Sequence, residues 1–140
     1  MITLLITLFF SISSTWATVS TKGVKKDLFD TLIMGNYKSG MRVLCSNDQK
    51  CMVSLSQIRC TLDIANGEMS EEGSCTFKNR KGDFGVLYNK DAFKLALQLS
   101  LYGSNYKANG TEVKFFVRTA HCSGQKNRQG QFVKLCQVQN

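Results

Sequence analysis

Apolar and polar residues alternate over much of the chain, which is the pattern of β-strands with one buried face. The longest alternating segment covers residues 51–64, with the sequence CMVSLSQIRCTLDI. As a strand it divides its side chains between two faces: Met52, Ser54, Ser56, Ile58 and Cys60 on one, and Val53, Leu55, Gln57, Arg59 and Thr61 on the other. Shorter strands are predicted at residues 41–45, 74–78, 84–88, 113–119 and 131–138.

One segment, residues 89–102 (NKDAFKLALQLSLY), has the period of an amphipathic helix. Asn89 is a suitable N-cap, and Gly103 follows the last apolar residue as a helix-ending glycine. Its apolar face is wider than one core contact needs. The helix therefore packs under a sheet in the ordinary way, or is buried on two sides, against its own sheet and against neighbouring subunits. Residues 24–34 fit either a short helix or an entering strand.

The order of these elements is several strands, one helix and two further strands. It excludes a parallel βαβ sheet, and it predicts an α+β or mostly β fold, or a small barrel that carries one helix.

The N-terminus has the composition of a signal peptide. Residues 2–12 are almost wholly apolar, too few to span a bilayer, and Thr15 and Ala17 provide the small residues of a cleavage site. We therefore predict a signal peptide at residues 1–17 and a single secreted domain at residues 18–140, exported through the periplasm to the extracellular medium. The alternative is a buried N-terminal strand or helix.

Six cysteines follow the leader, and export makes disulfides the expected state of an even number. In antiparallel hairpins, a loop at residues 66–69 and a loop around Gln129 each place two cysteines opposite one another, ~4.5–5.5 Å apart. The main alternative joins Cys45 to Cys60 and Cys51 to Cys75. The predicted pairs are sequential: Cys45–Cys51, Cys60–Cys75 and Cys122–Cys136.

The cysteine spacing argues against a metal site. Zinc ligands favour closely spaced pairs, whereas these pairs are 6, 15 and 14 residues apart and no C-x-x-C occurs. We expect neither a metal nor another cofactor.

The net charge of the chain limits the classes of binding partner to be expected. Lys and Arg number 18 and Asp and Glu 10, which gives a net charge of +8. A basic exported protein tends to meet sialylated or sulfated glycans, phospholipid headgroups or an acidic protein, although the charge can also serve solubility alone.

Residues suited to catalysis are sparse. His121 is the only histidine, and it adjoins a cysteine of a predicted disulfide. The carboxylates of Glu68, Glu71 and Glu72 lie in a predicted loop, where solvation is the simpler role. We therefore predict a binding protein with no catalytic residues, not an enzyme.

Tyr37, Lys38 and Ser39 form a polar aromatic cluster flanked by turn signals and are the first candidates for a ligand contact. Tyr106 and Lys107 are a second, weaker candidate pair. A solvated loop is the alternative reading of both.

Single-stranded nucleic acid requires aromatic side chains on a basic face. Phe115 and Phe116 lie beside Lys114 and Arg118, but adjacent strand residues point to opposite faces. Export also argues against this ligand, so no nucleic acid is expected.

Three segments resemble the B subunits of bacterial toxins in which five B chains carry one A chain, of the pertussis-like and subtilase-cytotoxin types. They are IRCTLDIANGEMSEEGSCTFKN, LYNKDAFKLALQLSLYGSNYKANGTEVKFFVR and AHCSGQKNRQGQFVKLC, within residues 40–138. The likeness is one of pattern and order: a cysteine-closed hairpin, a helix, a strand and a C-terminal hairpin with two cysteines.

The resemblance implies a small OB-type barrel, a homo- or heteropentamer with helices lining a pore, binding of a host cell-surface glycan, and a catalytic A-type partner. We therefore expect a secreted toxin-like glycan-binding subunit of a ring. The alternative is a basic exported inhibitor or effector that binds an acidic protein.

Overall fold

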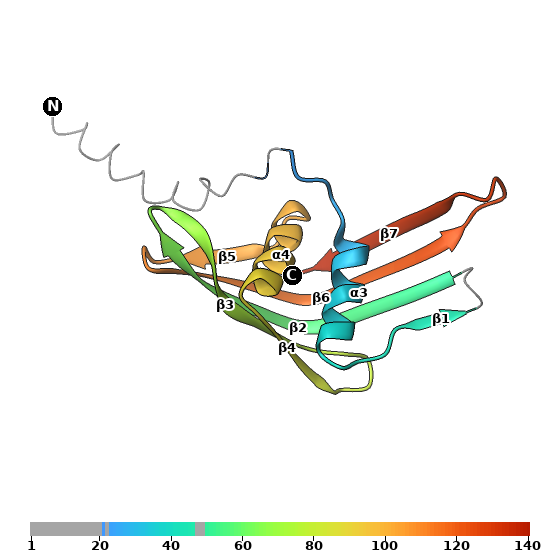
Figure 1. Cartoon of the computed structure of the whole chain (residues 1–140), viewed down its shortest axis with the longest axis horizontal. Helices are drawn as coiled ribbons and strands as arrows, with labels where there is room; N and C mark the ends of the chain where they lie inside the picture. Colours follow the sequence, from blue (N-terminus) through green and yellow to red (C-terminus); the bar gives the residue numbers. More distant parts are fainter. Residues whose placement is uncertain (1–20, 22, 47–49) are drawn as a thin grey trace, which may run out of the picture.

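The structure is a computed structural model that describes residues 21, 23–46 and 50–140 (Figure 1). The predicted signal peptide at residues 1–17 lies outside the described residues. In chain order the elements are α3 (Leu28–Lys38), β1 (Leu44–Ser46), β2 (Lys50–Ala65), β3 (Glu68–Lys78), β4 (Phe84–Tyr88), α4 (Lys90–Leu101), β5 (Asn105–Ala108), β6 (Glu112–Lys126) and β7 (Phe132–Gln139).

All the strands belong to one antiparallel sheet with β2 and β6 at its centre. These two strands pair from Lys50 opposite Gln125 to Asp63 opposite Glu112. On the far side of β2, β3 pairs with its second half and β1 with its start, while β4 extends the sheet beyond β3. On the far side of β6, β5 and β7 pair with successive stretches of the strand.

Both helices lie side by side on one face of the sheet (Figure 1). α4 buries Leu95, Ala96 and Leu99 completely, and α3 buries Leu28 and Leu32 against the same core. Burial of these apolar side chains, worth roughly 1.5–3 kcal/mol for each large one, is what holds the helices on the sheet. The apolar face of α4 is thus only partly covered by the described residues: Leu95 and Leu99 are buried, whereas Phe93, Leu97 and Leu101 are half-buried.

The mostly β, disulfide-linked class is confirmed, with two corrections. The described chain has two helices instead of one, because residues 28–38 form α3. The sheet is also open: β4 and β5 end the strand order and are not paired with each other, so the described residues form no closed OB-type barrel. Helix packing, not strand closure, covers the apolar inner face.

The predicted division of residues 51–64 between two faces is wrong beyond Gln57. This residue has φ +50°, and the β2–β3 register shifts between Ser56 and Arg59. Such a bulge changes which alternate side chains point inward. Arg59 and Thr61 consequently face outward. The buried side chains of β2 are Val53 and Leu55 before Gln57, and Ile58, Cys60 and Leu62 after it.

Three disulfides cross-link neighbouring strands, in the sequential pairing that the hairpin argument predicts: Cys45–Cys51, Cys60–Cys75 and Cys122–Cys136. They indicate an oxidising compartment, extracellular or periplasmic. Within the described part of the chain, no helix is long and apolar enough to cross a membrane.

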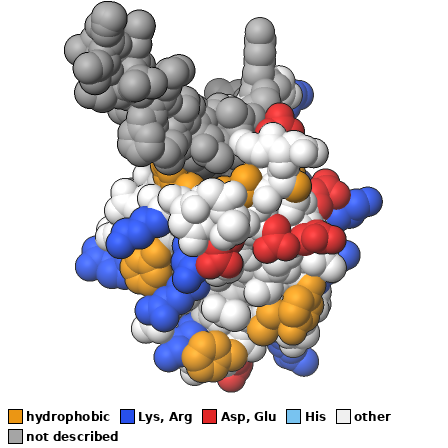
Figure 2. Space-filling model, turned by 90° about the vertical axis from the view of Figure 1, so that its left-hand side faces the viewer, with side chains coloured by type: hydrophobic (Ala, Val, Ile, Leu, Met, Phe, Trp, Pro, Cys, Tyr) orange, Lys and Arg blue, Asp and Glu red, His pale blue; other side chains and the backbone are white. Residues whose placement is uncertain are grey.

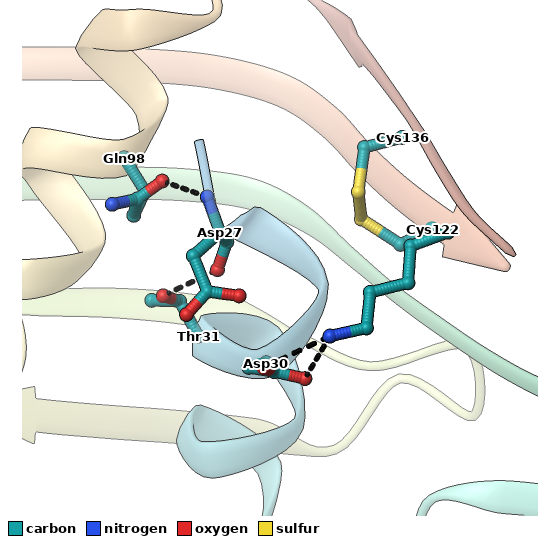
Figure 3. The surroundings of a disulfide bond; sticks show 7 residues. Asp27, Asp30, Thr31, Gln98, Cys122 and Cys136 are labelled. Atoms are coloured by element: carbon teal, nitrogen blue, oxygen red, sulfur yellow. Dashed lines mark hydrogen bonds and ion pairs between the residues drawn. A yellow bond between two sulfur atoms is a disulfide. The ribbon is translucent and has the colours of Figure 1, made fainter. Parts of the chain in front are cut away.

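The start of α3 is fixed to both α4 and β7. The Gln98 side chain accepts a hydrogen bond from the Asp27 backbone N–H at 2.6 Å (Figure 3). It also donates one to the Lys25 carbonyl at 3.1 Å. On the other side of α3, the Lys134 ammonium lies 3.1 Å from the Asp30 carboxylate. These contacts, beside the Cys122–Cys136 disulfide, hold the helix over one end of the sheet (Figure 3).

Candidate functional site

The side of the sheet that points away from the helices is exposed, and we call it the outer face. It is formed by the residues that alternate with the core positions of β2 to β6. Directly paired residues align across the strands, so that Val86, Thr76, Arg59, Phe116 and Asn105 form one row. Tyr88, Ser74, Thr61, Lys114 and Lys107 form the next.

Large aromatic side chains are exposed on this face. Phe84 and Tyr88 of β4 keep 69% and 65% of their surface accessible, and Phe116 of β6 keeps 41%. β4 presents them because Gly85 and Leu87 take the inward positions between them. These rings stand on two strands, β4 and β6, with β3 and β2 between them. Each offers an exposed apolar surface to a ligand on the outer face.

Cations lie among these aromatic rings. The Arg59 guanidinium is 5.2 Å from the Phe116 ring centroid, and the Lys78 ammonium is 4.9 Å from that of Phe84. Each exposed cation–π contact contributes about 0.5–1 kcal/mol and restrains the long basic side chain. Figure 2, which views the molecule from the β5 end of the sheet, shows Lys and Arg side chains around hydrophobic ones.

A groove of about 900 Å³ runs across β2, β6 and β5. This volume lies within the ~300–1,000 Å³ of ligand-binding clefts. Among the described residues its lining includes three cationic side chains, those of Arg59, Lys107 and Lys114, and no carboxylate. Phe116 contributes an aromatic wall. The groove is therefore suited to an anionic ligand with an apolar face.

Two polar groups of the groove are shielded from water to different degrees. Partial burial raises the pKa of the Tyr106 phenol above its ordinary value of 10.0. The Ser104 hydroxyl is buried and has no hydrogen-bond partner among the described residues. A buried polar atom without a partner is uncommon in folded proteins.

Of the two predicted ligand contacts, the structure places one in the groove. Tyr106 and Lys107 belong to β5 and line it. Tyr37, Lys38 and Ser39 lie at the end of α3 instead: Lys38 pairs with Asp91 at 3.4 Å, and the Ser39 hydroxyl donates to the Val86 carbonyl at 3.3 Å. Tyr37 is exposed and lies outside the groove, so this first candidate cluster stays a prediction.

Sequence reasoning missed Phe84 and Tyr88. The signal was present in the alternation of residues 84–88, where Gly85 stands at an inward position because Phe77 and Met41 leave no room for a side chain. An added Cβ at Gly85 would lie 2.4 Å from the Phe77 ring. Gly85 and the buried Leu87 alternate with Phe84 and Tyr88 along β4. Because Gly85 and Leu87 point inward, the two aromatic residues must point outward.

The other residues considered for a catalytic role lie on separate strands. His121 is half-buried on β6 next to Cys122. Glu68, Glu71 and Glu72 are exposed on β3. In the part of the chain that the structure describes, no three His, Cys, Asp or Glu residues gather in a way that could hold a metal ion.

Comparisons with protein-family models, with curated proteins and with solved structures find no match to this chain.

Proposed function

We propose that the protein is an exported binding module whose outer face recognises anionic glycans. The observation that carries the proposal is the mixture of exposed aromatic rings and cations on one open sheet face. A sugar ring has apolar C–H faces that pack on aromatic side chains, while acidic substituents attract Lys and Arg. The net charge of +8 favours such a ligand at longer range.

The resemblance to toxin B subunits extends the proposal to a host cell-surface glycan, a pentameric ring and a catalytic A-type subunit. Glycan binding by the outer face requires neither a closed OB-type barrel nor a ring. The side of α4 that carries Leu95 and Leu99 is buried within the chain, so a ring contact on this helix would use its half-buried side, with Phe93, Leu97 and Leu101. A native mass spectrum tests assembly separately from binding.

Binding is tested with the purified, unreduced protein on a glycan array, followed by titration of a sulfated polysaccharide, a polyuronate and a neutral polysaccharide. We expect binding to the acidic polymers only, and affinity that falls as salt is added. The double variant F84A/Y88A removes exposed aromatic rings without touching the core. It should weaken binding at least tenfold.

The matched control is V133A/L135A on β7, which removes exposed apolar side chains outside the aromatic and cationic rows of the outer face. It should bind as the wild type does. Absence of glycan binding overturns the proposal. Binding of a single-stranded oligonucleotide instead, or stoichiometric capture of one acidic protein, would assign the outer face to that ligand.

A further inference from the structure

Two lysines face each other directly across the groove. Lys107 of β5 is paired with Lys114 of β6, and both point to the outer face. Like charges in directly opposed positions destabilise a strand pair. The cost falls on a short element, because β5 has only four residues, all of them in this pairing.

The described residues offset little of this repulsion. Glu112 approaches Lys114 at 3.6 Å from a neighbouring outward position, whereas Lys107 makes no ion pair within the described part of the chain. Arg59 adds a third cation to the same groove, and none of the described residues that line it carries a carboxylate. The repulsion between Lys107 and Lys114 is thus largely uncompensated in the free protein. A bound anion between them would compensate it.

We propose that the groove holds the acidic group of one sugar unit between Lys107 and Lys114. This inference rests on the proposed glycan-binding function and adds its recognition element. An anion at this position would neutralise the opposed charges, and the Arg59 guanidinium, restrained over Phe116, would supply planar donors to the same group. The Phe116 ring adds an apolar wall to the groove beside this group.

The groove volume exceeds that of one pyranose ring, so a disaccharide is a sufficient ligand. Carboxylated and sulfated sugars share the required chemistry. Three probes separate the sources: an uronic-acid disaccharide without sulfate, a sulfated disaccharide without carboxylate, and a neutral disaccharide of the same linkage. Inorganic sulfate is a fourth probe, for the anion without the sugar.

The decisive variant is Lys107→Glu. It replaces the repulsive pair by an attractive one, so the free protein should have a higher Tm than the wild type while its disaccharide affinity falls at least tenfold. Lys107→Ala should show the same loss of affinity. Lys126→Glu, which makes the same charge change at the far end of β6, is the control and should keep the wild-type affinity.

We expect at least one acidic disaccharide, but not the neutral one, to bind the wild type and to raise its Tm. If long acidic polysaccharides bind while every disaccharide fails, or if the Lys107 variants bind disaccharide as the Lys126 variant does, this inference is wrong and the proposed function stands. If no glycan of any length binds, both are wrong.

Discussion

Cys60 of β2 lies directly opposite Cys75 of β3, and the disulfide between them is buried beneath α4. The Cys75 sulfur is 3.5 Å from the Ala92 carbonyl oxygen of that helix. The bond therefore joins two strands at the point where a helix packs on them.

Removing this disulfide should cost more than removing the one between Cys45 and Cys51. A loop of 15 residues corresponds to about 3 kcal/mol of unfolded-state entropy, and C60A/C75A also loses buried packing. The pair Cys45–Cys51 closes a loop of 6 residues, worth about 2 kcal/mol, and Cys45 is exposed. Guanidinium unfolding of C60A/C75A and C45A/C51A measures both, and the reverse ranking would contradict this account.

Strand pairing between cysteines was predictable because summed residue numbers are constant in a hairpin, but the path between them was not. The first hairpin turns over Asn66 and Gly67, both with positive φ, so β3 begins at Glu68 and the predicted loop at residues 66–69 is wrong. A register shift between Leu62 and Ile64 then restores Cys60 opposite Cys75. The shorter turn and the register shift compensate one another, so the predicted cysteine pairing is still correct.

Most of the structural features that could not be predicted from the sequence are bulges and short elements. A bulge depends on tertiary packing and leaves no period in the sequence, so the outward direction of Arg59 could not be predicted. β5 has only four residues and was missed for the same reason. Helix α4 was predictable within one residue at each end from its period and from Gly103. The predicted capping by Asn89 is wrong, because its side chain accepts a hydrogen bond from the Gly73 N–H and makes none to the helix. Of the residues that line the groove, the sequence singled out only Tyr106 and Lys107 as candidates for a ligand contact.

Gly73 should tolerate no side chain. It lies opposite Leu62 with φ +148°, and a Cβ atom there would stand 2.1 Å from the Thr61 carbonyl oxygen. Gly73→Ala should therefore destabilise the protein by about 3 kcal/mol or more, through backbone strain and a clash with backbone that cannot move aside. Urea unfolding is the measurement.

The control for this substitution is Gly82→Ala in the turn after β3. Gly82 also has a positive φ, +90°, but nothing lies within 4 Å of its added Cβ. Only the conformational cost of about 1–2 kcal/mol is expected. Equal losses of stability in the two variants would show that the contact with Thr61 is unimportant.

Gln98 should contribute to the stability of the protein through its side-chain hydrogen bonds. Its amide bonds two backbone groups ahead of α3, at Asp27 and Lys25. Gln98→Leu leaves both without partners, which should cost about 1–3 kcal/mol and speed amide hydrogen exchange in the first turn of α3. Gln137→Leu, at an exposed position of β7, should stay within about 0.5 kcal/mol of the wild type. Unchanged exchange in α3 would contradict the role given to Gln98.

Asp27 should make the protein less stable as pH rises through the acid range. Partial desolvation of its largely exposed carboxyl raises the pKa above 3.8, the hydrogen bond and negative charge of Asp30 raise it further, and the positive charge of Lys134 lowers it. A carboxyl with a raised native pKa binds its proton more tightly in the folded state. The stability that this proton contributes is therefore fully present below about pH 3.8. It is lost as pH rises through the native pKa, and above that pKa the loss is complete.

Asp27→Asn removes this titration and keeps a residue suited to the start of a helix. Because Asp27 is exposed, the effect is small, and it is best measured as the difference between variant and wild-type urea midpoints from about pH 3.5 to 7. The difference should grow in favour of the variant as pH rises and then level off. Glu72→Gln, an exposed carboxylate on β3, controls for the loss of one negative charge. A variant that is less stable than the wild type at neutral pH would show that the charge of Asp27 stabilises α3 instead.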